Sequence, residues 1–371
     1  MARLAQQIRR IHATPWQAVI YLTGGGSRLV SDLLQVPGAS NTVLESRIPY
    51  AQASLTDLLG RAPDQACSLD TALDLASTAF ARALALAPDR PGHLLGIGLT
   101  ASLASQPIKR GPHRVHLAIQ SQQRTCWWHL ELSKGQRRRR GEEQLTRDLA
   151  LHALAEASGL QTTFTGAASD RLQHDGVDAS DSWQALLLGQ QDCLRQGPDF
   201  SPRVLFPGAF NPLHDGHRQM AAIGSELTGH PVSFEVCANN VDKPRLNYWS
   251  LAQRLNQFDA DAQVWVTNLP TFIEKARCFP GVCFLVGADT IERIGELRYY
   301  GNDSASLNHA MAELASLGCR FLVFGRRLGK RFQTLADITL PPALRALCEE
   351  VPESRFRVDL SSSSLRRQAP Y

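Results

Sequence analysis

The chain has 371 residues, of which 43% are hydrophobic and 20% are charged, and its formal net charge is +4 at pH 7. This length suits two domains, and so small a positive charge permits anionic substrates but does not argue for a nucleic-acid partner. No run of about eighteen apolar residues occurs, so we expect no transmembrane helix and no membrane partner. The eight cysteines contain no CxxC pair, which favours reduced thiols and a cytoplasmic protein.

The sequence of the first half predicts a compact α/β or α+β domain over residues 1–160. An apolar segment at 16–22 leads into three consecutive glycines, Gly24 to Gly26, and a periodic helical run follows them. A helix rich in alanine and leucine is predicted at 68–87. Alternation of apolar and polar residues predicts antiparallel neighbours among the strands that come next. These strands are expected at 94–104, 113–120 and 125–133, before a helix at 137–159.

Residues 161–200 predict a linker that contains one helix. The part from 161 to 182 is polar and without period, whereas 182–197 fit a single helix. The turn-rich sequence GPDFSPR closes this linker. A second domain is then expected over residues 201–371.

The second half alternates strand-like and helical segments. Apolar strands that alternate with helices predict a Rossmann-like, doubly wound parallel sheet, so both domains belong to the α/β class. Ligands of such sheets bind beyond the carboxyl ends of the strands, at the switch point. Three loops are expected to meet there: 207–214, 287–289 and 361–366. The last predicted elements are a helix at 343–351 and a strand at 356–360.

The stretch 204–220 carries the clearest chemical signal. An apolar strand leads through a loop with glycine and proline to His214 and His217, at the predicted start of a helix. Histidines three residues apart share one face of a helix, and a helix N-terminus attracts anions. Two imidazoles at an anion site indicate phosphate chemistry. A metal site is the alternative, but no third ligand is evident nearby.

Residues 208–217, GAFNPLHDGH, match the (G/T)xFxPxHxGH signature of the nucleotidyltransferase superfamily. Within that superfamily the sequence most resembles nicotinate and nicotinamide mononucleotide adenylyltransferases. Three further segments carry the resemblance in the order that the family has them: FLVGAD at 284–289, FLVFGRR at 321–327 and LSSSSLR at 360–366.

The resemblance implies transfer of the adenylyl group of ATP to nicotinamide or nicotinate mononucleotide, with release of pyrophosphate. It implies that His214, His217 and Arg366 are catalytic and stabilise charge on the transferring phosphoryl group. We expect Mg²⁺ to accompany ATP, held mainly by phosphate oxygens and water. The residues implied in ATP binding come from the motifs: Gly208, Ala209, Phe210, Gly216, Gly287, Asp289, Ser361, Ser362 and Ser363.

Four more residues are candidates for binding the substrates. Lys243 either closes over a phosphate or is a solvated loop lysine. Arg326 lies just past a strand, where an arginine can grip a phosphate. Tyr299 and Tyr300 stand where the family has a tryptophan-containing segment against the pyridine ring. Asp289 either contacts the nucleotide or caps the helix that follows it.

Residues 23–60 resemble the C-terminal domain of CinA, a family with many nicotinamide mononucleotide deamidases. VPG at 36–38, Tyr50 and LLG at 58–60 fall at the family's spacing. The family's serine nucleophile falls on Thr23 and its lysine falls on Leu55, which leaves a hydroxyl nucleophile without an evident base. We therefore expect a degenerate domain, with Thr23 and Tyr50 as a vestigial deamidase site.

The main hypothesis is a two-domain cytoplasmic enzyme that binds ATP and a phosphorylated small molecule and forms a homo-oligomer. One alternative keeps this chemistry with another phosphorylated acceptor, such as phosphopantetheine, or with CTP. A second makes the first domain the active part, as an amidohydrolase that uses Thr23. A third makes the chain a nucleotide sensor or scaffold without turnover.

Overall fold

The computed structural model divides the chain into two compact units. The first unit comprises Met1–Leu188 and Asp242–Leu251, and the second comprises Gly189–Val241 and Ala252–Tyr371. The chain therefore enters the first unit twice. No helix in the described part of the chain is long and apolar enough to cross a membrane. The residues that the structure describes are 2–239, 244–328 and 331–358.

The first unit is built on a mixed sheet whose described strands lie in the order β2-β1-β3-β4-β5-β6. Strand β1 pairs in parallel with β2 and β3, and the strands from β3 to β6 pair antiparallel. The predicted antiparallel pairing of the strands at 113–120 and 125–133 is confirmed. The bounds are β1 Gln17–Thr23, β2 Val43–Arg47, β3 Leu94–Ser102, β4 His113–Gln120, β5 Arg124–Leu132 and β6 Arg171–Asp178.

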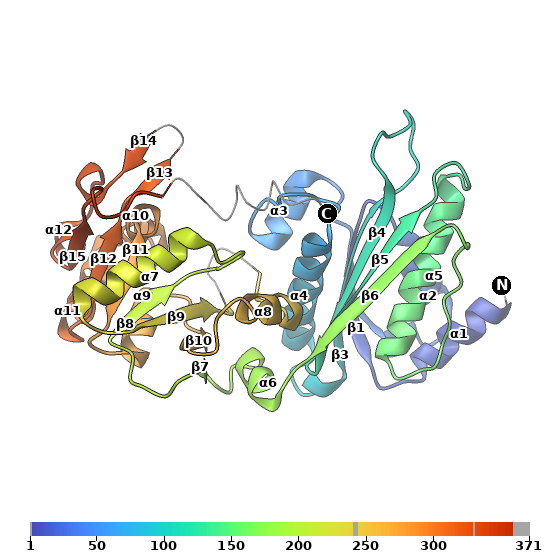
Figure 1. Ribbon diagram of the computed structural model, residues 1–371. Helices are drawn as coiled ribbons and strands as arrows, with labels where there is room; N and C mark the ends of the chain where they lie inside the picture. The colour runs from blue at the N-terminus through green and yellow to red at the C-terminus, as the bar shows by residue number, and fades with distance from the viewer. Residues whose placement is uncertain (1, 240–243, 329–330, 359–371) are drawn as a thin grey trace. The chain divides into compact units, whose positions relative to one another are not determined.

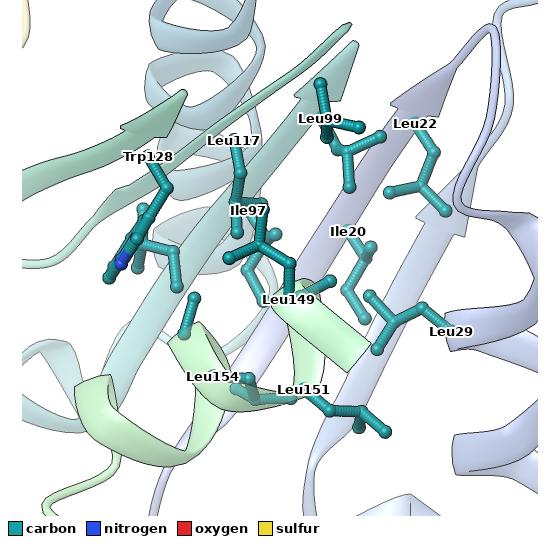
Figure 2. Packing of buried hydrophobic residues seen from close by; sticks show 14 of the residues in the cluster. Ile20, Leu22, Leu29, Ile97, Leu99, Leu117, Trp128, Leu149, Leu151 and Leu154 are labelled. Carbon is teal, nitrogen blue, oxygen red and sulfur yellow. The ribbon is translucent and has the colours of Figure 1, made fainter. Parts of the chain in front are cut away.

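Helices cover both faces of this sheet (Figure 1). Helices α1, α2 and α5 lie on one face, where they form a core with β1, β3, β4 and β5. Figure 2 shows Ile20, Ile97 and Leu117 of the strands beside Leu149 of α5. Helices α3, α4 and α6 pack on the other face. Their bounds are α1 Ala2–His12, α2 Ser27–Gln35, α3 Gln52–Leu59, α4 Leu69–Leu86, α5 Arg139–Ala157 and α6 Asp181–Leu187.

Two glycines of β3 allow α4 to lie directly on the sheet. A Cβ at Gly96 would stand 2.2 Å from the backbone oxygen of Ala76, and one at Gly98 would stand 2.2 Å from that of Ala72. Real side chains do not approach backbone so closely, so the helix needs glycine at both positions. On the helix side, α4 presents alanines, whose small side chains also allow this close approach. The Ser68 side chain caps the helix by accepting a hydrogen bond from the Thr71 N–H at 3.2 Å.

The structure corrects the expected linker at 161–200. Residues 171–178 form β6, which pairs antiparallel with β5 at the edge of the first sheet. This strand is polar and mostly exposed, so it lacks the apolar alternation that reveals a half-buried strand. The helix predicted over 182–197 is shorter, because α6 ends at Leu187 and residues 193–196 form the strand β7.

The return segment of the first unit, residues 244–251, is bound into its core. Tyr248 begins α8 (Tyr248–Leu255) and is only 2% exposed. Its backbone N–H donates to Thr125 Oγ1 at 3.0 Å, and its hydroxyl donates to the Gln122 carbonyl at 2.7 Å. Trp249 packs edge-on against Trp127, with ring centroids 5.4 Å apart. The first unit is therefore incomplete without a segment that the sequence assigned to the second domain.

The second unit is built on a sheet whose described strands lie in the order β15-β12-β11-β8-β9-β10-β7 (Figure 1). Neighbours pair in parallel except β7, which pairs antiparallel with β10. Without β7 this is the doubly wound 3-2-1-4-5-6 order, with its switch point between β8 and β11. The predicted fold class is confirmed. The bounds are β7 Cys193–Gln196, β8 Val204–Pro207, β9 Val232–Cys237, β10 Val264–Thr267, β11 Cys283–Gly287, β12 Arg320–Phe324 and β15 Cys348–Val351.

The last elements differ from the prediction. The helix expected at 343–351 is the short α12, and residues 348–351 form β15, the final parallel strand beside β12. The segment predicted as the last strand has no regular structure at 356–358, and its last two residues lie outside the described part. A hairpin of β13 and β14 follows β12. The remaining bounds are α7 Asp215–Thr228, α9 Phe272–Cys278, α10 Ala288–Ile294, α11 Ser304–Ser316, α12 Pro342–Arg345, β13 Arg326–Leu328 and β14 Arg331–Gln333.

Because Tyr248 is buried in the first unit, Tyr248→Ala is expected to destabilise that unit by about 3 kcal/mol. Tyr248→Phe removes only the hydrogen bond to Gln122 and should lower stability by about 1 kcal/mol. Urea unfolding of the full chain measures both changes. Tyr50→Ala is the matched control, because the Tyr50 side chain is exposed. An unchanged unfolding midpoint for Tyr248→Ala would show that the first unit does not need this segment.

Candidate functional site

The loop after β8 is shaped by the aromatic ring of Phe210. A Cβ at Gly208 would stand 2.5 Å from this ring, so only glycine leaves room for it there. Phe210 has a φ of 42°, a left-handed conformation that is rare for a residue with a side chain. Its ring is 1% exposed and packs edge-on against Phe206, Phe234 and Phe258. Phe210 is thus a buried support of the loop.

His214 and His217 lie together at the N-terminus of α7, as predicted. Their rings stack with centroids 3.7 Å apart, and the His217 ring also meets Phe210 edge-on at 5.1 Å. The backbone N–H of His214 donates to His217 Nδ1 at 3.2 Å. Because Nδ1 accepts this hydrogen bond, neutral His217 carries its proton on Nε2, which is then a donor. Gly216 leaves space for His214, since a Cβ there would stand 3.0 Å from the imidazole.

Both histidines are held in the neutral form. Burial, then the neighbouring His214 and then Arg326 lower the pKa of His217 to about 3. Burial and then Arg326 also lower the pKa of His214. The His214 Nδ1 atom is buried and makes no hydrogen bond to the described residues. At neutral pH the pair therefore offers polar N–H groups to an anion without carrying positive charge of its own.

Arg326, at the start of β13, brings positive charge to the described part of the site. Its guanidinium forms an ion pair with Asp289 in the first turn of α10. Arg326 lies close enough to both histidines to lower their pKa values, and it is paired with Asp289, so one arginine links the surroundings of the loops at 207–214 and 287–289. From the sequence, Asp289 is expected either to cap the helix that follows it or to contact the nucleotide. The structure shows it bound to Arg326.

The other predicted site residues have different places. Ala209 is exposed in the loop, and Gly287 stands just before α10, where a Cβ would meet the Asp289 carboxylate at 2.8 Å. Tyr300 is half-buried and donates to the Ile294 carbonyl at 2.9 Å, and burial raises its pKa to about 12. The Tyr299 ring lies under the Arg298 guanidinium, 4.6 Å from its centroid. Tyr300 packs against the core of the second unit, and both tyrosines are partly buried.

Five predicted residues lie outside the described part of the chain. Four of them belong to the loop at 361–366, the third loop expected at the switch point. They are Lys243, Ser361, Ser362, Ser363 and Arg366.

Gln257 is a residue of this site that the sequence did not reveal. Its side-chain amide accepts a hydrogen bond from the Leu213 N–H at 2.7 Å and donates to the Phe210 carbonyl at 2.9 Å. It follows α8, more than forty residues beyond the loop. No local sequence pattern links Gln257 to the histidines, so its place in this site is visible only in the folded structure.

Residues 205–368 match the Cytidylyltransferase-like family. This part of the chain is a cytidylyltransferase-like domain. The match begins in β8 and includes both histidines, Asp289, Arg326 and the serine-rich segment at 361–364. The domain is thus of the nucleotidyltransferase type, which acts on nucleotide substrates.

Solved structures similar to the chain include the competence/damage inducible protein CihA from Agrobacterium tumefaciens, at 22% identity. That match covers 42% of this chain and 95% of that one, with a TM-score of 0.33. A CinA superfamily protein from Klebsiella pneumoniae is 16% identical over 42% of this chain and 96% of its own, with a TM-score of 0.32. One from Escherichia coli is 13% identical over 42% of this chain and 87% of its own, with a TM-score of 0.33. Among curated proteins, none matches the chain significantly.

Thr23 and Tyr50, the predicted vestigial site of the first unit, have different surroundings. Thr23 is buried, and its hydroxyl donates to the Pro49 carbonyl at 2.9 Å. The Tyr50 side chain is 70% exposed. Leu55 is 1% exposed and belongs to the core on the α4 face of the sheet. An apolar side chain in that core provides no base for the Thr23 hydroxyl.

The glycine loop of the first unit is filled by the protein itself. A Cβ at Gly24 would stand 1.9 Å from the Ala101 carbonyl oxygen. A Cβ at Gly25 would stand 3.1 Å from the Glu143 carboxylate, which also accepts a hydrogen bond from the Ser27 hydroxyl at 3.1 Å. The Arg139 guanidinium lies beside the same loop and donates to the Gly24 carbonyl at 2.8 Å, so a cation and an anion both lie at these glycines.

We predict that His217 remains neutral in the folded protein well below pH 6.5, and that His214 titrates below its ordinary pKa. Unfolded histidine titrates near 6.5, so the unfolded chain binds more protons between pH 6.5 and about 3. The contribution of His217 to stability is therefore complete above pH 6.5 and falls as the pH drops through this window. Imidazole nitrogen shifts, measured by NMR from pH 8 to pH 4 and assigned with His217→Asn, test this. A folded-state titration of the His217 ring near 6.5 would contradict it.

Proposed function

We propose that the cytidylyltransferase-like domain joins ATP to nicotinamide or nicotinate mononucleotide and releases pyrophosphate. The observation that carries this proposal is the stacked pair His214 and His217 at the N-terminus of α7, beside the switch point. α7 has 14 residues, so its first N–H groups and its dipole favour an anion at that end. Arg326 supplies a formal positive charge beside the same two rings.

In the proposed reaction, a phosphate oxygen of the mononucleotide attacks the α-phosphorus of ATP. A new P–O bond forms, the bond from the α-phosphorus to the β-bridging oxygen breaks, and pyrophosphate leaves with that electron pair. The protein forms no covalent bond, so its work is to align two polyanions and to stabilise developing negative charge. The Nε2–H of His217 and the N–H groups of α7 are aimed donors for this charge.

Asp289 is proposed to position Arg326. The ion pair holds the guanidinium at the carboxyl edge of the sheet, where it can meet the phosphates without first losing rotamer freedom. Arg366 and Ser361 to Ser363 remain proposed phosphate ligands from the sequence motif. Lys243 and Tyr299 remain proposed acceptor contacts.

We also propose that Mg²⁺ enters with the triphosphate. Within the described residues, no group of three or more His, Cys, Asp or Glu side chains could hold a metal ion. Asp289 is already engaged with Arg326. Phosphate oxygens and water would coordinate the ion, and Mg²⁺ would lower the repulsion between the phosphates and the incoming nucleophile.

A second donor nucleotide has support of its own. The matched family is described as cytidylyltransferase-like, and the contacts proposed above for the described residues are contacts to phosphate and not to a base. CTP with another phosphorylated acceptor is therefore the rival proposal. Both donors belong in the same experiment.

We predict pyrophosphate release from ATP with nicotinamide or nicotinate mononucleotide in the presence of Mg²⁺. His217→Asn removes an aimed donor and should lower kcat by roughly 10²–10³-fold. His230→Asn is the control, because His230 is an exposed residue beyond the C-terminus of α7. A coupled pyrophosphate assay over ATP and CTP, each with both mononucleotides and phosphopantetheine, measures the rates.

The outcomes of this assay separate the alternatives. Release with CTP but not ATP would replace the adenylyl proposal by the cytidylyl one. No release from any pair would overturn nucleotidyl transfer in favour of a sensor or scaffold. Ammonia release from nicotinamide mononucleotide that is lost in Thr23→Ala would assign the activity to the first unit instead.

Arg326→Gln is expected to raise KM for the nucleotide about tenfold, because it removes a charge-assisted phosphate contact. It should also raise the pKa of His214 and His217, since Arg326 lowers both. Arg326→Lys keeps the charge and should leave the two pKa values low. Steady-state kinetics and imidazole NMR measure the two effects. Unchanged KM together with unchanged pKa values would remove Arg326 from the site.

A further inference from the structure

The histidine loop is held at two points by one side chain. Gln257 Oε1 accepts from the Leu213 N–H at 2.7 Å, and Gln257 Nε2 donates to the Phe210 carbonyl at 2.9 Å. The same Nε2 also donates to the Arg254 carbonyl at 3.3 Å, which ties the amide to the end of α8. The amide thus bridges the loop before His214 to a helix that does not belong to the motif.

The two backbone groups that Gln257 binds lie on either side of the turn. Phe210 stands at the left-handed φ of 42°, and Leu213 directly precedes the N-cap residue His214. Strained conformations persist only where surrounding contacts determine them. Here the contacts are the buried Phe210 ring below and the Gln257 amide beside the backbone.

The direction of the His214 backbone follows from these contacts. Its N–H must point at His217 Nδ1 to make the 3.2 Å hydrogen bond that fixes the His217 proton on Nε2. Leu213 is the residue immediately before this N–H. A loop released from Gln257 would loosen that hydrogen bond and with it the orientation and tautomer of His217.

We propose that Gln257 is a positioning residue of the nucleotidyl transfer site, acting through the loop backbone on His214 and His217. This inference rests on the proposed function for its kinetic consequence. Its structural content, the tautomer and orientation of His217, does not depend on which substrates the domain uses. The active geometry then requires an amide, because one group must accept from Leu213 while the other donates to Phe210.

Two substitutions of Gln257 separate its two bonds. Gln257→Leu has a similar size and makes neither bond. Gln257→Glu can still accept from Leu213 but presents an oxygen to the Phe210 carbonyl. Both substitutions should lower kcat, and Gln257→Leu should lower it by roughly 10- to 100-fold. KM for the nucleotide should change less than threefold, because a small displacement of the histidines disturbs the alignment of the reacting groups more than it weakens substrate binding. A rise in KM at unchanged kcat would contradict a positioning role.

Gln263→Leu is the matched control for loss of stability. Gln263 is 1% exposed and donates to the Pro198 and Phe200 carbonyls, in the same unit but with partners outside the histidine loop. It should lower the thermal midpoint at least as much as Gln257→Leu while kcat stays unchanged at a temperature where the protein is folded. Equal losses of kcat in both variants would show that Gln257 acts only through stability.

Imidazole nitrogen NMR tests the inference without turnover. The wild-type protein should show His217 as a single Nε2–H tautomer, and Gln257→Leu should show a tautomer mixture with a higher His217 pKa. Gln263→Leu should keep the wild-type pattern. An unchanged His217 spectrum in Gln257→Leu would overturn the inference. If the wild-type protein releases no pyrophosphate with any substrate pair, the proposed function fails and this spectrum still decides the role of Gln257.

Discussion

The burial of the Phe210 ring beneath Gly208 is the contact on which the site of the second unit depends. The ring fills the space that a side chain at 208 would need, and it meets Phe206, Phe234 and His217 edge-on. The loop must therefore turn over this ring and enter α7 with His214 at the N-cap. Phe210, which the family resemblance places among the nucleotide-binding residues, also supports the loop that carries the histidines. Residue 208 must be glycine because the Phe210 ring occupies the space that a side chain would need.

The electrostatics of the site follow from the same crowding. Stacked and partly desolvated imidazoles cannot both be charged beside Arg326, so their pKa values fall and they act as neutral donors. The formal charge is left to Arg326, which Asp289 holds in place. Among the described residues, a polyanion entering this site would meet the Arg326 guanidinium, N–H groups and the end of a helix dipole. Such an arrangement stabilises charge in a transferring phosphoryl group without a base or a nucleophile from the protein.

The sequence predicted those parts of the fold that leave a local pattern. The β8 loop and α7, the paired histidines and the doubly wound order all depend on motif spacing or apolar periodicity. The polar edge strand β6 and the short strands β7 and β15 were not predicted, because strands at the edge of a sheet need little apolar alternation. The ion pair of Asp289 with Arg326 and the Gln257 bridge join residues far apart in the chain, which no local pattern records. The return of residues 244–251 to the first unit was hidden for the same reason, since YWSL fits a helix of either unit.

The central claim is that His214, His217 and Arg326 form the phosphate-binding centre of a nucleotidyltransferase. Its most direct test is a crystal structure of the full chain with Mg²⁺ and a non-hydrolysable ATP analogue. We predict that triphosphate oxygens lie within hydrogen-bonding distance of His217 Nε2 and of the first N–H groups of α7, with the Arg326 guanidinium on the same phosphates. A triphosphate bound elsewhere, with the two imidazoles still stacked and facing water, would contradict the account.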